Sequence, residues 1–173
     1  DMLADDRLKT TDVVFWQEHK YRTRACKLAA ERLKKGGRIC FFADAQLTTK
    51  AGISGGTAIA TLSHIGHSPP STLRSSIMAE GRILLRHVHG CLPGGLLCAC
   101  VYLPVRRGAQ GRDEHLRVVH QLGRFLAMFN SPFLVGGDWN CSPAELAATG
   151  IPDRLQATVV RGSQPTCYTP TGR

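Results

Sequence analysis

The amino-acid sequence predicts a layered α/β sandwich, and three features of the 173-residue chain support that fold class. Short apolar runs recur between turns rich in glycine and proline, which is typical of strands. Two longer segments carry apolar residues at helical spacing. The run at residues 96–103 is apolar on both alternating faces, so both faces are expected to be covered. Strands of this kind, joined by hairpins and helical crossovers, form layered α/β domains.

The expected strands share an apolar run bounded by turn residues, and they lie at 12–17, 38–43, 57–62, 81–88 and 96–103, with a last one that begins at Phe133. Between the expected strands 81–88 and 96–103, Pro93-Gly94-Gly95 predicts a hairpin turn. The stretches 44–52 and 64–76 are polar or contain adjacent prolines, so we expect them to be loops.

Helices are expected in three places. The first covers residues 21–35, because Gly36-Gly37 would end it. The strongest helical pattern lies at residues 113–130, with an apolar stripe at helical spacing and Pro132 just beyond it. After the last strand, Ser142-Pro143 predicts the start of a short, capped helix.

The composition is that of an ordinary soluble globular protein, with 43% hydrophobic and 20% charged residues, and the length predicts one domain over residues 1–173. The formal net charge is +9 and the isoelectric point is near 9.6. Basic surfaces concentrate polyanions, so nucleic acid is the expected partner. Charge alone would also fit an anionic membrane surface, a phosphoinositide headgroup, or a basic protein without a polyanion partner.

Seven cysteines, an odd number with no Cys-x-x-Cys pair, indicate free thiols and a reducing, intracellular compartment. No segment approaches the ~20 apolar residues that a membrane span requires, and the first residues lack a secretory apolar region. The chain begins at Asp1 and ends at Arg173 without an evident cap, so we expect a piece of a longer protein.

The segment that begins at Phe133 ends in Gly136-Gly137-Asp138-Trp139-Asn140. Alternation along a strand would place Asp138 and Asn140 on the same side, with Trp139 turned away. The apolar run is interpreted as a buried strand, and the glycines would let another backbone or a phosphate come close. An acid and an amide displayed together suit a metal or a phosphate ester. The alternative is a strand followed by an Asx-type turn.

A second apolar strand, at residues 12–17, also ends in a carboxylate, Glu18. Ligands collect beyond the carboxyl ends of strands in α/β sheets. If the two strands lie side by side and point the same way, Glu18 and Asp138 would share one hard cation. Mg²⁺ prefers a few carboxylate oxygens together with water and substrate phosphate, so it is the expected metal.

Five motifs occur along the chain in an order that resembles one superfamily: Val14-Phe15-Trp16-Gln17-Glu18-His19, Gly55-Gly56-Thr57-Ala58-Ile59, Gly81-Arg82-Ile83, Val101-Tyr102-Leu103-Pro104 and Gly136-Gly137-Asp138-Trp139-Asn140. They resemble the endonuclease/exonuclease/phosphatase superfamily, and most closely the apurinic-type endonuclease domain of LINE-type retrotransposons. The match covers nearly the whole chain. It implies a four-layer α/β/β/α sandwich of two packed mixed sheets and an Mg²⁺-dependent DNA endonuclease, with Mn²⁺ as the alternative metal.

The resemblance also implies roles for individual residues. Glu18 would bind the metal, Tyr102 would contact the phosphate, Asp138 would orient or activate the attacking water, and Asn140 would hold the scissile phosphate. Thr166 matches a threonine of the family and is a further candidate. Arg82 is left outside the catalytic set, because a charge at a strand edge is usually solvated.

Two departures from the family concern the ends of the chain. The family has an asparagine on a strand before the Gln-Glu motif and a catalytic histidine on a strand that would follow Arg173. None of the seven histidines lies in a matching context, and His19 is expected to face solvent or to stack locally. The resemblance therefore implies a fold that is incomplete at its N- and C-terminal strands, and a fragment that is inactive because it lacks its general acid or base.

Two other functions stay open at this point. A non-catalytic remnant that binds nucleic acid would fit the missing strands and histidine, and a phosphoesterase of the same fold would act on a soluble or lipid phosphate. The leading hypothesis is nicking of double-stranded DNA in retrotransposition, which would imply a nuclear location and no membrane partner. The sequence leaves the oligomeric state open.

Overall fold

The structure is a computed structural model that describes residues 6–47, 52–71, 75, 77–90, 92–129 and 131–160. It divides into two compact units, Asp1–Asn140 and Cys141–Arg173. The larger unit contains the two main sheets, and the described part of the smaller unit contains two short helices. The expectation of one domain over residues 1–173 stays a prediction.

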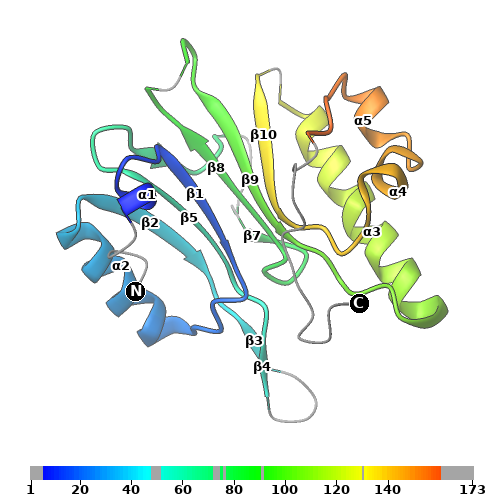
Figure 1. Ribbon diagram of the computed structural model, residues 1–173, viewed down its shortest axis with the longest axis horizontal. Coiled ribbons are helices and arrows are strands. Elements are labelled where there is room, and N and C mark those ends of the chain that lie inside the picture. Colours follow the sequence, from blue (N-terminus) through cyan, green and yellow to red (C-terminus); the bar gives the residue numbers. More distant parts are fainter. Residues whose placement is uncertain are drawn as a thin grey trace. The chain divides into compact units, whose positions relative to one another are not determined.

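The first sheet of the larger unit has the strand order β1-β5-β2 and is antiparallel throughout. Helix α2 covers its outer face and packs on β2 through the buried side chains of Cys26 and Leu33 (Figure 1). The elements are β1 (Val13–Gln17), α2 (Thr23–Lys35), β2 (Arg38–Ala43) and β5 (Thr57–Leu62).

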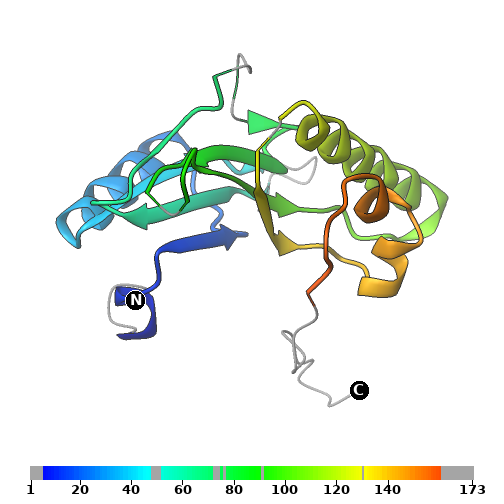
Figure 2. The same cartoon turned by 90° about the horizontal axis from the view of Figure 1, so that it is seen from above.

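The second sheet has the order β10-β9-β8-β6, and β7 also pairs with β8. Its pairing is mixed, because β10 runs parallel to β9 while the other pairs are antiparallel. Helix α3 lies along this sheet on the side away from the first sheet (Figures 1 and 2). The elements are β6 (His67–Ser68), β7 (Ile77–Met78), β8 (Ile83–Val88), β9 (Leu96–Tyr102), α3 (Gly108–Ala127) and β10 (Phe133–Asp138).

The predicted four-layer α/β/β/α sandwich is therefore confirmed in the larger unit, from α2 through the two sheets to α3. Of the two sheets, the second is mixed and the first is antiparallel throughout. The main strands and both long helices occur where the apolar patterns predict them, within a few residues at each end.

The core between the two sheets consists of the buried residues Ala43, Ile59, Leu84, Val88, Cys98 and Cys100. In the first sheet Phe15 lies opposite Ile59 in the β1–β5 register, and in the second Gly136 lies opposite Cys100 in the β10–β9 register. The Phe15 ring packs onto Gly136: a Cβ at that glycine would lie 2.5 Å from Phe15 Cδ2. Glycine at position 136 is thus required by the approach of the two sheets.

The strand at Phe133 is less buried than the sequence predicts. The expectation of a fully buried strand is wrong, because β10 is the edge strand of its sheet and pairs only with β9 among the described strands. Leu134 is 46% exposed and Asp138 is also exposed. The short apolar run resembles a central strand in composition, but sheet order decides its burial.

Several short elements escape sequence prediction. The predicted loops contain the two-residue strands β3 (Gln46–Leu47) and β6, and further short elements are α1 (Asp6–Lys9), β4 (Ile53–Ser54), β7 and α5 (Ile151–Arg154). Two residues cannot establish a period. Helix α3 begins at Gly108 rather than at residue 113. Its first turn contains two glycines, Gly108 and Gly111, which weaken the helical signal in the sequence. Gly111 packs closely against the segment just before the helix, because a Cβ there would lie 2.8 Å from the Val105 carbonyl oxygen.

In the smaller unit, the predicted capped helix is present as α4 (Pro143–Ala147). Ser142 and Glu145 form a capping box: the Glu145 N–H donates to Ser142 Oγ over 3.3 Å, and the Ser142 N–H donates to Glu145 Oε2 over 2.8 Å. Proline at the first helical position fits because that residue has no intrahelical donor to lose.

No helix among the described residues is long and apolar enough to cross a membrane. Five of the cysteines, Cys26, Cys40, Cys98, Cys100 and Cys141, are described and carry free thiols. Burial raises the pKa of the Cys100 thiol to about 11 and that of Cys40 to about 12, so both stay protonated at neutral pH. Cys100 acts as a small apolar side chain in the core, and Cys40 is partly buried.

At the far end of the sheets, a buried arginine is held by a histidine. Arg86 Nε donates to His67 Nδ1 over 2.9 Å, and its guanidinium carbon lies 4.4 Å from the centroid of the Phe41 ring. His67 Nε2 lies 3.2 Å from the Ile39 carbonyl oxygen and donates to it, because Nδ1 already accepts. Burial first, and then the Arg86 charge, lower the pKa of His67 to about 4.

The contact between Phe15 and Gly136 gives a first prediction. Gly136→Ala should destabilise the protein by about 1–3 kcal/mol, because the added methyl overpacks the ring. Phe15→Leu alone should also cost stability. The double variant should lose clearly less than the sum of the two single losses, since the smaller side chain leaves room for the methyl. Urea unfolding of the four proteins measures this coupling, and simple additivity would contradict the contact.

The lowered pKa of His67 gives a second prediction. Because the folded pKa is below the unfolded value of about 6.5, stability from neutral His67 is present above pH 6.5 and is lost as the pH falls toward 4. The free energy of unfolding of the wild type, measured relative to His67→Gln, should therefore decrease across that window and level off below it. A difference that is independent of pH would show that His67 is not held in its neutral form.

Candidate active site

The ends of three strands meet at one edge of the larger unit. Tyr102 is the last residue of β9 and lies opposite Asp138, the last residue of β10. Glu18 directly follows β1 in the other sheet and bonds to Tyr102. The strands that carry Glu18 and Asp138 thus face each other across the sandwich, and they do not lie side by side in one sheet as the sequence suggested. The two acids nevertheless flank the same tyrosine.

The contact between Tyr102 and Glu18 is the centre of this arrangement. The Tyr102 hydroxyl donates to Glu18 Oε1 over 2.6 Å, although the residues are 84 positions apart. Burial raises the pKa of Tyr102 to about 12, with further contributions from the Glu18 hydrogen bond and charge and from the Asp138 charge. The phenol therefore keeps its proton at neutral pH and is a hydrogen-bond donor.

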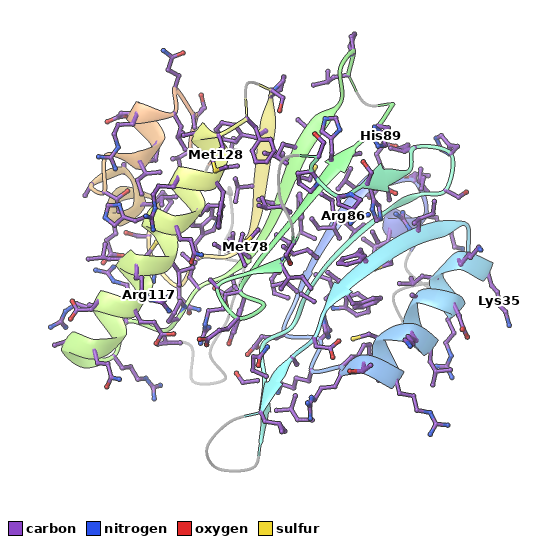
Figure 3. The ribbon with its side chains drawn as sticks, turned by 180° about the vertical axis from the view of Figure 1, so that it is seen from behind. Lys35, Met78, Arg86, His89, Arg117 and Met128 are labelled. Atoms are coloured by element: carbon purple, nitrogen blue, oxygen red, sulfur yellow. The ribbon has the colours of Figure 1, made fainter. Side chains whose placement is uncertain are left out.

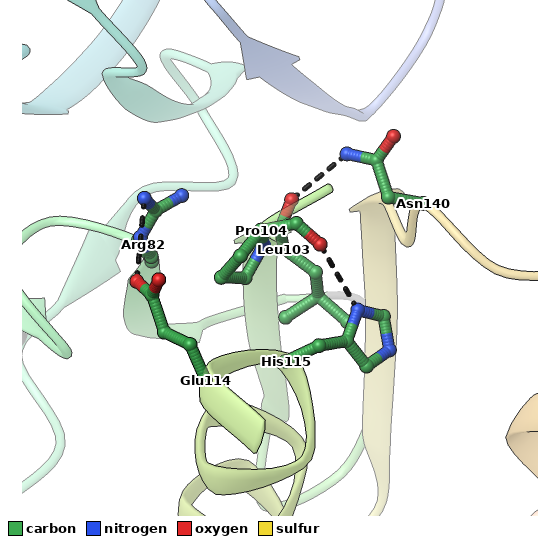
Figure 4. Close-up of polar contacts among 6 residues, drawn as sticks. All are labelled: Arg82, Leu103, Pro104, Glu114, His115 and Asn140. Carbon is green, nitrogen blue, oxygen red and sulfur yellow. Dashed lines mark hydrogen bonds and ion pairs between the residues drawn. The ribbon is translucent and has the colours of Figure 1, made fainter. Parts of the chain in front are cut away.

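Asp138 and Asn140 are close to each other because a turn, and not the continued strand on which the alternation argument relied, brings them together. The Asn140 N–H donates to Asp138 Oδ1 over 3.1 Å, which is the Asx-type contact that the sequence left as the alternative. Asn140 Nδ2 donates to the Leu103 carbonyl oxygen over 2.8 Å (Figure 4). The Leu103 N–H donates to the Asp138 carbonyl oxygen over 2.8 Å, so this segment is fixed to the end of β9.

Gly137 permits that close approach. Its φ is +150°, and a Cβ at this position would overlap the carbonyl oxygen of Val101 on β9. The two adjacent glycines thus have different structural roles, Gly136 toward the Phe15 ring and Gly137 toward the neighbouring backbone. The sequence indicated close approach here but did not reveal its target.

Two of the candidate residues have left-handed backbone conformations. Glu18 has φ +53° and Asn140 has φ +46°. Such conformations cost of order 1 kcal/mol or more for residues other than glycine and concentrate at functional sites. Asparagine tolerates them better than glutamate does. Lys20, Ala79, Glu80 and Gln156 also have positive φ, so the conformation of Glu18 is compatible with a functional position but does not identify one.

His19 stabilises the loop that carries Glu18. It is 8% exposed and packs in a cluster of rings with Trp16, Tyr21 and Phe42. Its Nδ1 accepts from the Tyr21 N–H over 3.0 Å, and burial lowers its pKa, so it is neutral. Local stacking was one of the two expectations for His19; solvent exposure was the other and is wrong. A Cβ at Gly56 would lie 2.5 Å from this ring.

A pocket of about 280 Å³ opens beside Tyr102. It is lined by Gln46, Leu47, Ser54, Gly55, Gly56, Glu80, Gly81, Arg82 and Tyr102. Sequence analysis did not select Arg82, yet its guanidinium carbon lies 5.8 Å from the centroid of the Tyr102 ring. Arg82 Nη2 also lies 3.6 Å from Glu114 Oε1 on α3 (Figure 4). The Gly81-Arg82-Ile83 motif was the available signal, but a single charge at a strand edge does not reveal a pocket.

The oxygen donors at this edge are of the kind that a hard cation prefers. Glu18 and Asp138 are both exposed, and each offers carboxylate oxygens beside Tyr102. Among the described residues no group of three His, Cys, Asp or Glu side chains is placed to hold a metal. A closed zinc site needs such a group, whereas Mg²⁺ takes one or two carboxylates and completes its shell with water and phosphate. Thr166, the further candidate, lies outside the described residues.

Comparison with known proteins finds likeness in structure alone. No family model and no curated protein matches the chain. The catalytic domain of human Nocturnin with a bound sulfate anion matches with a TM-score of 0.58 and 16% identity, over 86% of this chain and 59% of that one. A humanized TDP2 of D. rerio with 14 mutations matches with a TM-score of 0.54 and 19% identity, over 83% and 55%.

A β-hairpin deletion mutant of the beta toxin of Staphylococcus aureus matches with a TM-score of 0.61 and 11% identity, over 92% of this chain and 64% of that one. The larger unit has the endonuclease/exonuclease/phosphatase fold. At these identities the likeness establishes the fold. The chain spans about 55–64% of the length of the three solved structures.

The pKa of Tyr102 offers a direct test of the geometry. Glu18→Gln removes the carboxylate charge next to the phenol, so the pKa of Tyr102 should fall below the wild-type value of about 12. The Cζ chemical shift of Tyr102, followed by NMR across alkaline pH, measures it. Glu80→Gln is the matched control, because Glu80 lines the same pocket and is not among the groups that shift Tyr102. Equal effects of the two variants would contradict the Tyr102–Glu18 contact.

Proposed function

We propose that this chain is part of a metal-dependent phosphodiesterase that nicks double-stranded DNA, of the type found in LINE-type retrotransposons. The observation that carries the proposal is the 2.6 Å hydrogen bond between Tyr102 and Glu18, with Asp138 opposite the same tyrosine. It gathers two carboxylates and a phenol at one edge. The fold likeness and the net charge of +9 support a hydrolase that acts on a polyanion.

In this proposal Glu18 holds Mg²⁺, with Mn²⁺ as the alternative. The bound metal would offset negative charge on the phosphoryl oxygens. When substrate binds, the Tyr102 hydroxyl would turn its hydrogen bond from Glu18, whose oxygens would then face the metal, to a nonbridging phosphate oxygen. Its raised pKa keeps the hydroxyl protonated at neutral pH. Asn140 Nδ2 has two hydrogens; one is bonded to the Leu103 carbonyl, and the other is free to bind the phosphate.

Asp138 has the role of orienting the attacking water. Its Oδ1 already accepts from the Asn140 N–H, which fixes the carboxylate and leaves Oδ2 for the water. As water attacks phosphorus, Asp138 would accept the proton that the water loses. The bond to the leaving oxygen breaks, and that oxygen needs a proton. The superfamily resemblance assigns this proton transfer to a histidine beyond Arg173. General acid–base catalysis contributes about 10²- to 10⁴-fold, so the 173-residue chain alone should be weakly active or inactive.

The acid pair provides the decisive test. The chain, extended by its native flanking sequence at both ends, should nick supercoiled plasmid in Mg²⁺. Glu18→Ala or Asp138→Ala should reduce the rate at least 10²-fold, because each removes a group proposed to act on the phosphate. Asp113→Ala is the control, since it deletes an exposed acid of α3 with the same change in net charge. Nicking that survives both site substitutions would exclude this site.

Metal removal and substrate choice separate the alternatives. EDTA should stop nicking, and added Mg²⁺ or Mn²⁺ should restore it. Salt-sensitive DNA binding without any cleavage by the extended chain would indicate a non-catalytic remnant. Preference for inositol phosphates over plain or abasic duplex would indicate a phosphoesterase of the same fold. A nuclear location is part of the retrotransposon proposal and is tested by imaging the tagged, extended protein.

A further inference from the structure

Positive charge is denser on α2 than over the chain as a whole. Within its thirteen residues, Thr23–Lys35, the helix carries five cations and one acid, a net charge of +4 out of +9 for the whole chain. The cations are Arg24, Lys27, Arg32, Lys34 and Lys35, and all five are exposed. Lys35 extends from the outward side of α2 in Figure 3.

Helix stability does not account for this charge. Cations in the last turn interact favourably with the helix dipole, which covers the three at the C-terminal end. Arg24, however, lies in the first turn, where the dipole is positive and where this helix has no acid. The N-terminal Thr23 N–H is satisfied instead by Asp44, which accepts from it over 2.8 Å. The cation at this end therefore opposes the dipole and needs another explanation.

We propose that the outer face of α2 is a second nucleic-acid surface, separate from the candidate active site, that binds the phosphate backbone of duplex DNA. From Arg24 to Lys35 the helix rises roughly 16 Å at about 1.5 Å per residue. Along that length a DNA duplex presents about one phosphate charge per 1.7 Å. Several cations on one helix face can thus contact phosphates together. None of the five lines the pocket beside Tyr102.

The chemistry of the face favours a duplex over two other polyanions. Helices that enter a lipid surface need a free apolar face. In α2 the apolar side chains of Cys26 and Leu33 are buried under the helix, and Leu28 is its one exposed large apolar side chain. Single strands are bound largely by stacking on aromatic rings. The sequence of α2 contains no aromatic residue.

The test compares two variants with the same net charge. One replaces Arg24, Lys27, Lys34 and Lys35 on α2 by Gln, and the control replaces Arg107 and the α3 residues Arg112, Arg117 and Arg124 by Gln; all eight are exposed. Arg117 lies on the opposite side of the larger unit from Lys35 (Figure 3). Binding of a short DNA duplex by the 173-residue chain is measured in EDTA over a range of salt, so that cleavage does not interfere.

Each phosphate contact contributes about 0.9 to the slope of log K against log salt concentration. The α2 variant should reduce that slope by about 2–4, and the α3 variant by less than about 1. If the two variants lowered the salt slope equally, net charge alone would explain the loss of slope, and the proposal would be overturned. Loss of binding to phosphatidylserine vesicles without loss of duplex binding would also overturn it, in favour of a membrane. Tighter binding of single strands than of duplex would do the same.

Two half-variants guard against misfolding. One carries Arg24→Gln and Lys27→Gln, and the other carries Lys34→Gln and Lys35→Gln. Each should lower the salt slope by about half as much as the four-fold α2 variant does. Circular dichroism checks that the fold is retained. The measurement requires no catalysis. If the extended chain fails to nick DNA but the α2 variant lowers the salt slope, the proposed reaction is wrong and the α2 surface is supported. If the extended chain nicks DNA but the α2 variant leaves the slope unchanged, the α2 surface is wrong and the reaction is supported.

Discussion

The Phe15 ring occupies the space that a side chain at position 136 would fill, and this contact sets how closely the two sheets approach. Interiors pack as densely as organic crystals, so an added methyl at such a contact overpacks the core and costs stability. The short separation places the end of β1 next to the end of β9. Tyr102 can therefore reach Glu18, which comes from a different sheet. The candidate site thus depends on a steric fit in the core.

Around this edge, the rigid parts of the fold hold the strained ones. Glu18 and Asn140 are both in the left-handed region, and each is fixed by neighbours: Glu18 by Tyr102, and Asn140 by Asp138 and Leu103. Below Glu18, His19 is buried among aromatic rings and hydrogen-bonded at both nitrogens. A site whose groups are already oriented loses less free energy on binding the transition state. The strain is consistent with preorganisation of this kind.

The charges of the larger unit are arranged with opposite signs in different places. Two carboxylates flank Tyr102 at the strand ends, while the cations gather on the outer side of α2. If the candidate site cleaves DNA as proposed, its carboxylates would repel the substrate in the absence of a metal. In the proposal made here, the basic helix away from the site would supply attraction and increase the rate of encounter at low salt.

The sequence by itself determined the order of the main strands and helices, because the apolar periods and the glycine and proline turns are local signals. Superfamily resemblance of the motifs added the four-layer fold and the set of Glu18, Tyr102, Asp138 and Asn140, which the structure places at one edge; their roles stay predictions. Tertiary structure alone decided that β10 is an exposed edge strand, that His19 is buried, and that Arg82 lines a pocket. Burial and pocket shape depend on which segments pack together across the sandwich. A local pattern of residues does not determine that packing.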